Sequence, residues 1–117
     1  MKKKLVYIAS PVRAVYEEYD RANHGEHGTD TDCINDYANE GIRRVYNAGH
    51  IPISPVMIFS NIYDEFEERE EILEACKLLL SRCDEIMVID TPYNKYSEGI
   101  KIELALAKEL GITQVEY

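Results

Sequence analysis

A glutamate interrupts the apolar face of a helix predicted near the C-terminus. Residues 96–111 follow a helical pattern, and at about 100° per residue Glu103 falls in the middle of that face. The face comprises Gly99, Ile100, Leu106, Ala107 and Leu110, and the charged residues fall opposite. Burying an unpaired carboxylate is costly, so such a group is normally neutralised, paired or functional. Glu103 is therefore a satisfied polar side chain, a side chain that reaches out to solvent, or a reactive carboxylate.

The start of the same helix offers a second group. Ser97 is the expected N-cap, and the free N–H groups of a helix N-terminus suit a hydroxyl, phosphate or carboxylate. Gly99 lets a ligand or another backbone approach closely, and Glu103 lies one turn below it on the same face. Ordinary capping by Ser97 beside a packing glycine is the alternative interpretation.

The first predicted strand ends in further candidates. Tyr7 projects from an apolar run, and a buried tyrosine hydroxyl needs a partner, for which a carboxylate across the sheet is suitable. Ser10 and Pro11 follow the strand, and Arg13 could hold an anion there. A core tyrosine satisfied by backbone and a surface arginine are the alternatives.

Strand and helix patterns alternate along the chain, and the predicted strands are 4–9, 50–55, 85–90 and 112–115. The predicted helices are 31–49, 64–82 and 97–110, with a mobile loop over 17–31 and an apolar connection over 56–63. This order predicts a single α/β domain over residues 1–117. We expect a doubly wound, flavodoxin- or Rossmann-like parallel sheet of four to five strands with helices on both faces.

In such folds, ligands bind at the carboxyl ends of the strands. Pro55 ends the second strand and Asp90 ends the third, so both join the candidate site. Asp90 could accept a hydrogen bond from a ligand hydroxyl or cap the following turn. His24, His27, Asp30 and Asp32 resemble a metal-ligand cluster, but without helical spacing they are better interpreted as solvated loop residues, so no metal centre or cofactor is expected.

Composition excludes several classes of protein. The chain has 117 residues, 22 acidic and 13 basic, and a net charge of −9, which argues against a nucleic-acid partner. The apolar run after Lys2-Lys3-Lys4 is too short for a signal peptide or a membrane span. Three cysteines without CxxC spacing indicate buried thiols in a reducing compartment. We therefore expect a cytoplasmic protein.

Three segments in order resemble the nucleoside 2-deoxyribosyltransferase superfamily, and most closely its small uncharacterised phage and bacterial members. They are Tyr7-Ile8-Ala9-Ser10-Pro11, the strand at 83–90, and Ser97-x-Gly99-x-x-x-Glu103. Residues 50–55 and Arg69 also match positions of that pattern. The resemblance implies that Glu103 is a nucleophile that attacks the anomeric carbon of a 2′-deoxynucleoside, that Tyr7 orients it, and that Ser97 contacts sugar or phosphate.

The resemblance also implies a homo-oligomer and a nucleoside or nucleotide substrate, with Ser97 similar to the branch that acts on 5′-monophosphates. One position departs from the pattern, because Cys76 stands where the transferases have an aspartate that protonates the leaving base. Either Asp90 substitutes for that aspartate, or the chemistry is absent. Three hypotheses follow: an N-glycoside-cleaving or deoxyribosyl-transferring enzyme, a catalytically inactive nucleotide-binding protein with the same pocket, and a structural domain in which Glu103 is merely satisfied.

Overall fold

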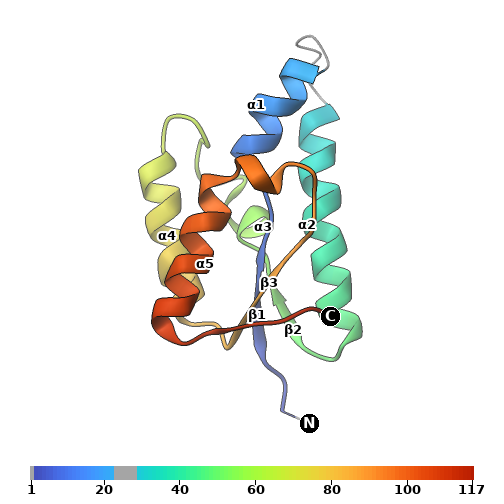
Figure 1. Ribbon diagram of the computed structural model, residues 1–117, viewed down its shortest axis with the longest axis vertical. Coiled ribbons are helices and arrows are strands. Elements are labelled where there is room, and N and C mark those ends of the chain that lie inside the picture. The colour runs from blue at the N-terminus through green and yellow to red at the C-terminus, as the bar shows by residue number, and fades with distance from the viewer. Residues whose placement is uncertain (1, 23–28) are drawn as a thin grey trace.

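The computed structural model describes residues 2–22 and 29–117, which form an α/β fold. The strands are β1 (Leu5–Ala9), β2 (Ile51–Ile53), β3 (Glu85–Val88) and β4 (Thr113–Gln114). The helices are α1 (Arg13–Ala22), α2 (Thr29–Asn47), α3 (Pro55–Phe59), α4 (Arg69–Ser81) and α5 (Glu98–Leu110), and a 3₁₀ helix, η1 (Asn94–Tyr96), precedes α5. Figure 1 shows three layers, with α2 on one side of the sheet and α4 and α5 on the other.

The sheet has four parallel strands in the order β2-β1-β3-β4, as expected for a doubly wound fold. Strand β1 is central: its Tyr7 is in register with Ile53 of β2 on one side and with Ile86 of β3 on the other. The chain leaves β1 toward β2 and then returns past β1 to β3, so the strand order reverses between β1 and β3. A crevice outside the carboxyl ends of the strands at such a reversal is the usual ligand site of this architecture.

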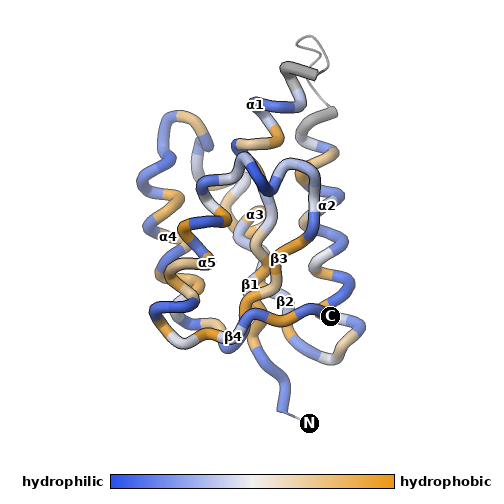
Figure 2. The backbone as a smooth tube through the Cα atoms, in the orientation of Figure 1, coloured by the Kyte–Doolittle hydropathy of each residue, from blue (hydrophilic) through white to orange (hydrophobic). Residues whose placement is uncertain are grey.

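Side chains of β1 alternate between the two faces of the sheet, as the period of two in a strand requires. Val6 and Ile8 pack with Met87 and Ile89 of the third strand region and with Val45 of α2. Figure 2 shows the hydrophobic colours concentrated on β1 and β3 and the hydrophilic colours on the outer turns of the helices. Helix α2 packs on this first face through Val45, Ile42 and Tyr37.

The opposite face packs against α4 and α5. Tyr7 and Ala9 of β1 contact Leu80 of α4 together with Ile100 and Ala107 of α5. Both Tyr7 and Ala9 are fully buried. A tyrosine has thus taken a core position on the face that carries the last helix.

A close helix–sheet approach is made possible by Gly41 of α2. A Cβ at this position would lie 2.6 Å from Ile8 Cγ2 and 3.0 Å from two side-chain carbons of Ile89. Both neighbours are buried core residues of the sheet. Any side chain at position 41 would therefore push α2 away from the strands.

Both ends of α5 agree with the sequence expectation. The Ser97 hydroxyl accepts a hydrogen bond from the Ile100 N–H at 3.2 Å, as an N-cap does, and Gly111 closes the helix in the left-handed conformation with φ of 72°. Ile100 and Ala107 face the core, whereas Lys101 and Glu109 are exposed.

Several predicted boundaries are wrong. Residues 17–22 and 29–31 were expected to be loop, yet they belong to α1 and α2, while residues 23–28 with His24 and His27 lie outside the described part of the chain. Val15 and the partly buried Tyr16 and Tyr19 pack against Ile34 of α2, so tertiary contacts stabilise a polar helix. The apolar connection at 56–63 begins with helix α3, which the Ser54 hydroxyl caps through the Met57 N–H.

Helix α4 also begins later than predicted, at Arg69 rather than at the acidic run that opens with Asp64. The Asp64 carboxylate accepts hydrogen bonds from the N–H groups of Phe66 and Glu67, both at 2.9 Å. These bonds hold residues 64–67 as a turn rather than as the first turn of α4. The turn projects from the carboxyl end of the sheet and forms one wall of the site described below.

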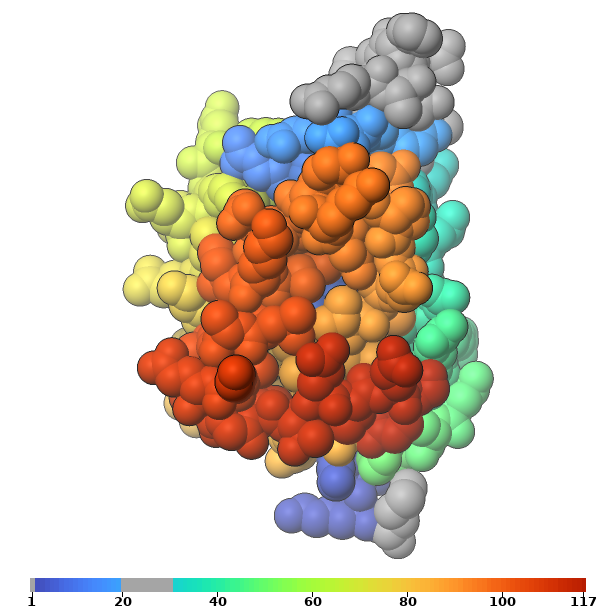
Figure 3. Space-filling view, viewed as in Figure 1, coloured from blue at the N-terminus to red at the C-terminus, as the bar shows by residue number. Residues whose placement is uncertain are grey.

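The two ends of the described chain meet at one carboxylate on the amino edge of the sheet. Glu85 of β3, 6% exposed, accepts hydrogen bonds from Lys4 Nζ at 3.3 Å and from the Tyr117 hydroxyl at 2.6 Å. Figure 3 shows the C-terminal part of the chain (orange to red) spread over the front of the molecule. Within the described residues, no helix combines the length and apolarity needed to cross a bilayer.

Candidate active site

A cavity of about 590 Å³ opens at the carboxyl end of the sheet. Its walls come from the loop after β1 and the start of α1, from α3 and the turn that follows it, from the inner face of α4, and from the first turns of α5. Because β1 and β3 flank the reversal in strand order, the cavity occupies the place where this architecture usually binds ligands.

One end of the cavity holds Glu103. Its side chain is partly buried and lines the cavity, so it is neither sealed in the core nor turned to bulk solvent. Burial raises the pKa of Glu103 to about 7, and interaction with the Tyr7 hydroxyl opposes the rise. Near neutral pH this carboxyl group therefore exchanges readily between its protonated and ionised forms, as suits a carboxylate that must react.

Tyr7 and Cys76 surround Glu103. The Tyr7 hydroxyl is buried and meets the geometric criteria for a hydrogen bond with no group of the described chain, although the carboxyl of Glu103 and the thiol of Cys76 are close enough to shift its pKa. Burial, followed by the charge of Glu103, raises the pKa of Tyr7. Burial raises the pKa of Cys76 to about 11. Both neighbours thus stay neutral at physiological pH and can orient the carboxylate without adding charge.

Ser97 and Gly99 lie above the carboxylate at the start of α5. A Cβ on Gly99 would stand 3.9 Å from Glu103 Oε1 and 3.9 Å from Ser97 Oγ, both ordinary contact distances. Steric crowding therefore does not require a glycine at this position. It leaves open space between the helix N-terminus and the carboxylate, and this space is part of the cavity.

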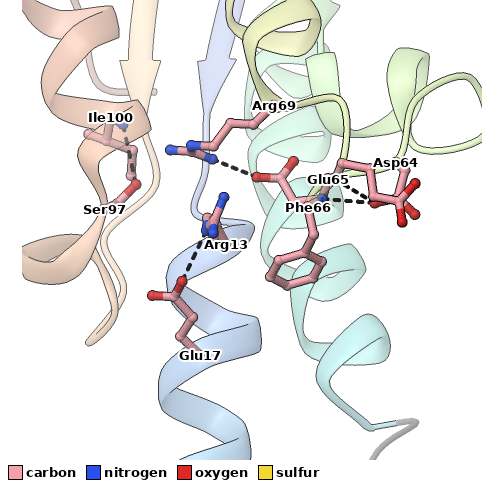
Figure 4. Close-up of polar contacts among 9 residues, drawn as sticks. Arg13, Glu17, Asp64, Glu65, Phe66, Arg69, Ser97 and Ile100 are labelled. Atoms are coloured by element: carbon pink, nitrogen blue, oxygen red, sulfur yellow. Dashed lines mark hydrogen bonds and ion pairs between the residues drawn. The ribbon is translucent and has the colours of Figure 1, made fainter.

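Two arginines stand across the cavity from α5. Arg13 Nε lies 3.0 Å from Glu17 Oε1, and Arg69 Nη1 lies 2.7 Å from Glu65 Oε1. Figure 4 shows Arg69 extending toward Arg13 between Ser97 and the Glu65–Phe66 turn. Burial raises the pKa of Glu65, whereas the charges of Arg69 and then Arg13 lower it. These guanidinium groups can bind an anion at the mouth of the cavity.

Aromatic rings complete the walls. Phe66 is half exposed, packs against Tyr16 at a ring-centroid distance of 5.4 Å, and carries the Arg13 guanidinium 5.1 Å above its ring. Phe59 and Tyr63, with centroids 5.8 Å apart, also line the cavity. Flat aromatic walls of this kind can stack on a heterocyclic base.

Most residues that the sequence singled out come together here. The residues that line the cavity are Ser10, Arg13, Pro55, Ser97, Gly99 and Glu103. Tyr7 lies beneath them in the core beside Glu103. The Ser10 hydroxyl is buried and, like that of Tyr7, has no hydrogen-bond partner within the described chain.

Two expected site residues lie elsewhere. Pro11 is fully buried and does not line the cavity. Asp90 is exposed and also lies outside the lining. The turn after Asp90 is held by Thr91, whose hydroxyl accepts from the Tyr93 N–H at 3.1 Å and donates to Asn94 Oδ1 at 2.6 Å. The structure therefore does not bring Asp90 to Glu103.

Sequence reasoning missed the cavity residues contributed by α1, α2 and the turn before α4. They include Tyr16, Glu17, Asn35, Glu65 and Phe66. The ion pairs Arg13–Glu17 and Glu65–Arg69 both have i,i+4 spacing, which was the available signal. Within the part of the chain that the structure describes, no group of three His, Cys, Asp or Glu side chains could hold a metal ion.

Comparison with known proteins gives the family of this chain. No curated protein matches the sequence. The family model described as a domain of unknown function (DUF7768) matches residues 4–117, which include every residue of the cavity. The chain therefore belongs to the DUF7768 family.

Proposed function

We propose that this protein cleaves or transfers the N-glycosidic bond of a nucleoside or nucleotide, with Glu103 as nucleophile. The observation that carries the proposal is the position of Glu103, which is partly buried, lines a cavity of about 590 Å³ and lies beside the Tyr7 hydroxyl. The likeness of residues 7–11 and 97–103 to the nucleoside 2-deoxyribosyltransferase motifs supports it.

The proposed chemistry takes two steps. A carboxylate oxygen of Glu103 forms a bond to C1′ of the sugar while the C1′–N bond breaks and its electron pair leaves with the base. Water or a second base then attacks C1′, and the electron pair of the C1′–O bond returns to Glu103. Tyr7 holds the carboxylate in place, and the low polarity around it favours attack on a centre with developing positive charge.

A 5′-phosphate is the preferred form of the substrate in this proposal. Arg13 and Arg69 line the cavity opposite the N-terminus of α5, where Ser97 opens the helix. Arginine forks and free helix N–H groups are the two groups that proteins most often use to bind phosphate. The sugar would then lie between them, over Gly99 and Glu103.

The test is a panel of nucleosides and their 5′-monophosphates, analysed by liquid chromatography for released base and by intact mass for a glycosyl-enzyme. The Glu103→Ala variant should release no base and form no adduct. Glu109→Gln, an exposed glutamate on the same helix, is the matched control and should behave like the wild type. Release of base by Glu103→Ala at the wild-type rate would refute the nucleophile.

A second candidate function is a nucleotide-binding protein without turnover. It is favoured by Cys76, which stands where the resemblance implies the acid of the transferases, and by Asp90, which lies outside the cavity. Under this alternative, a nucleotide raises the melting temperature without any release of base. If no nucleotide or nucleoside shifts the melting temperature, both functions fail and a purely structural role for Glu103 remains.

A further inference from the structure

Departure of a nucleobase poses a problem of charge. When the C1′–N bond breaks, an ordinary base takes the electron pair and leaves as an anion unless an acid protonates it. A positioned general acid typically contributes 10²–10⁴-fold to such a step. A base that already carries a fixed positive charge leaves as a neutral molecule and needs no proton. The acids available around Glu103 therefore decide which substrates can react.

The groups next to Glu103 are poor acids. The Cys76 thiol, whose pKa burial raises to about 11, stands where an acid would be useful. Burial and the charge of Glu103 also raise the pKa of Tyr7, so its hydroxyl retains its proton. Neither side chain can protonate a departing base efficiently near neutral pH.

Three other carboxyl groups of the described cavity wall already have partners. Glu17 pairs with Arg13 at 3.0 Å, and Glu98 pairs with Lys101 at 3.4 Å. Asp64 accepts hydrogen bonds from two backbone N–H groups.

Glu65 is the remaining carboxyl group, and it lies 2.7 Å from Arg69. Burial raises the pKa of Glu65 above its ordinary value, although the two arginines oppose that rise. Protonating Glu65 would break this ion pair and leave the partly buried Arg69 guanidinium without its carboxylate. Glu65 is therefore bound to its arginine rather than free to act as an acid.

Carboxyl groups outnumber guanidinium groups in the described cavity wall, which favours a base that carries a positive charge. Among the described lining residues, the carboxyl groups belong to Glu17, Asp64, Glu65, Glu98 and Glu103, and the guanidinium groups belong to Arg13 and Arg69. The aromatic rings add to this preference, since Arg13 already places its guanidinium over Phe66. A flat base with a positive charge would find both an aromatic surface and an excess of carboxylates.

We propose that the substrates are glycosides whose base carries a fixed positive charge, such as N-alkylated purine or pyridinium nucleotides. This inference rests on the proposed function. In the first step, Glu103 bonds to C1′ and the C1′–N electron pair neutralises the cationic base, so no proton is transferred. In the second step, water attacks C1′, the C1′–O pair returns to Glu103, and the proton of the water passes to solvent.

The test uses two substrates that differ by one methyl group: 2′-deoxyguanosine 5′-monophosphate and its N7-methyl derivative. Base release is followed by liquid chromatography with subtraction of the enzyme-free rate. The wild type should show a kcat/KM at least about 100-fold higher for the methylated nucleotide, which is the lower part of the range for a missing general acid.

A gain of function sharpens the test. Cys76→Asp would place a carboxylic acid beside the departing base, and should lower the preference for the methylated nucleotide at least tenfold by accelerating release from the unmodified one. Cys76→Asn has a similar shape but no acidic proton, and should give no such gain. If Cys76→Asp does not fold, the comparison of the two nucleotides with the wild type still decides the question.

Three outcomes would overturn the inference. Similar kcat/KM values for the two nucleotides would show that a proton donor exists. The inference would then fail, while the proposed function would stand. Loss of activity in Glu65→Gln would in that case identify Glu65 as the donor. Release of neither base would overturn the proposed function and the inference together. Equal release of the methylated base by wild type and Glu103→Ala would also remove both.

Discussion

The two faces of the central strand differ sharply in what they bury. On the α2 side, Val6 and Ile8 belong to a cluster of buried apolar residues, and Gly41 lets the helix approach closely. On the side of α4 and α5, the same strand places Tyr7 against Cys76 and Glu103. Both faces are built by five consecutive residues, so the contrast reflects what each face does rather than where it lies in the chain.

The contrast indicates where stability has been given up. A buried hydroxyl without a partner and a carboxyl group whose pKa burial raises to about 7 both oppose folding, whereas apolar side chains at these positions would not. Such costs are expected at sites where preorganised polar groups serve binding or chemistry. Substitutions on the two faces should therefore have opposite effects on stability and activity.

The largest effect on stability is expected from Gly41→Val on the α2 face. Its side chain would overlap Ile8 and Ile89, and this overpacking should cost about 1–3 kcal/mol in the free energy of unfolding, of which the higher helix propensity of valine over glycine offsets only a small part. Chemical denaturation would measure the loss, with the exposed Asn39→Val of the same helix as control. A change equal to that of Asn39→Val would contradict the close packing of α2.

The next largest effect is the pH dependence of stability that Glu103 causes on the face that packs against α4 and α5. The pKa of Glu103 rises from 4.5 in the unfolded chain to about 7 in the fold, so the stability contributed by its bound proton is complete below about pH 4.5 and is lost as the pH rises through about 7. Glu103→Gln stays neutral and should be more stable than the wild type by about 1–3 kcal/mol at pH 8, with a smaller gap at pH 5. Thermal melts across this range test the sign, and a gap that grows toward acid pH would contradict it.

The activity should follow the same ionisation. In the proposed reaction only the ionised form of Glu103 can attack, so kcat/KM should rise with pH and level off above about 7. Tyr7→Phe removes the hydroxyl that holds the pKa of Glu103 down, and should move the midpoint of this profile to higher pH while changing the free energy of unfolding by no more than about 1 kcal/mol. Tyr46→Phe, at an exposed position, should leave the profile unchanged.

The smallest effect on stability is expected for Gly99→Ala. The added methyl group would meet Glu103 and Ser97 only at ordinary contact distances, and alanine favours a helix by about 1 kcal/mol over glycine. The variant should therefore fold at least as well as the wild type. The methyl group nevertheless fills the space above the carboxylate, so base release should fall; unchanged kcat/KM would place the substrate elsewhere.

The last helix was the most predictable part of the molecule because its signals are local. Ser97 caps it, Gly111 ends it, and the apolar pattern between them identifies Glu103 as exceptional. Residues 17–22 of helix α1 were assigned to a loop because their sequence is polar, whereas the helix is stabilised by packing of Val15 and Tyr16 on α2. Local sequence preferences cannot predict this tertiary contact between the two helices.

The candidate site was predictable only in part for the same reason. Residues at the strand ends follow from the order of the elements, which brought Ser10, Pro55 and Ser97 to one edge. The opposite wall depends on the turn that the Asp64 carboxylate stabilises. The run of acidic residues in this turn had instead predicted the start of a helix. Phe66 of this turn packs against Tyr16 and Arg13 of α1. These tertiary contacts form that part of the cavity wall.

Glu85 joins Lys4 to Tyr117 at the edge of the sheet opposite the cavity. A fluorophore or affinity handle attached at either end would consequently sit far from the mouth and leave ligand entry unobstructed. If the protein were immobilised through such a handle, the mouth of the cavity would face the solution. Ligand binding could then be measured by surface plasmon resonance without blocking Arg13 and Arg69.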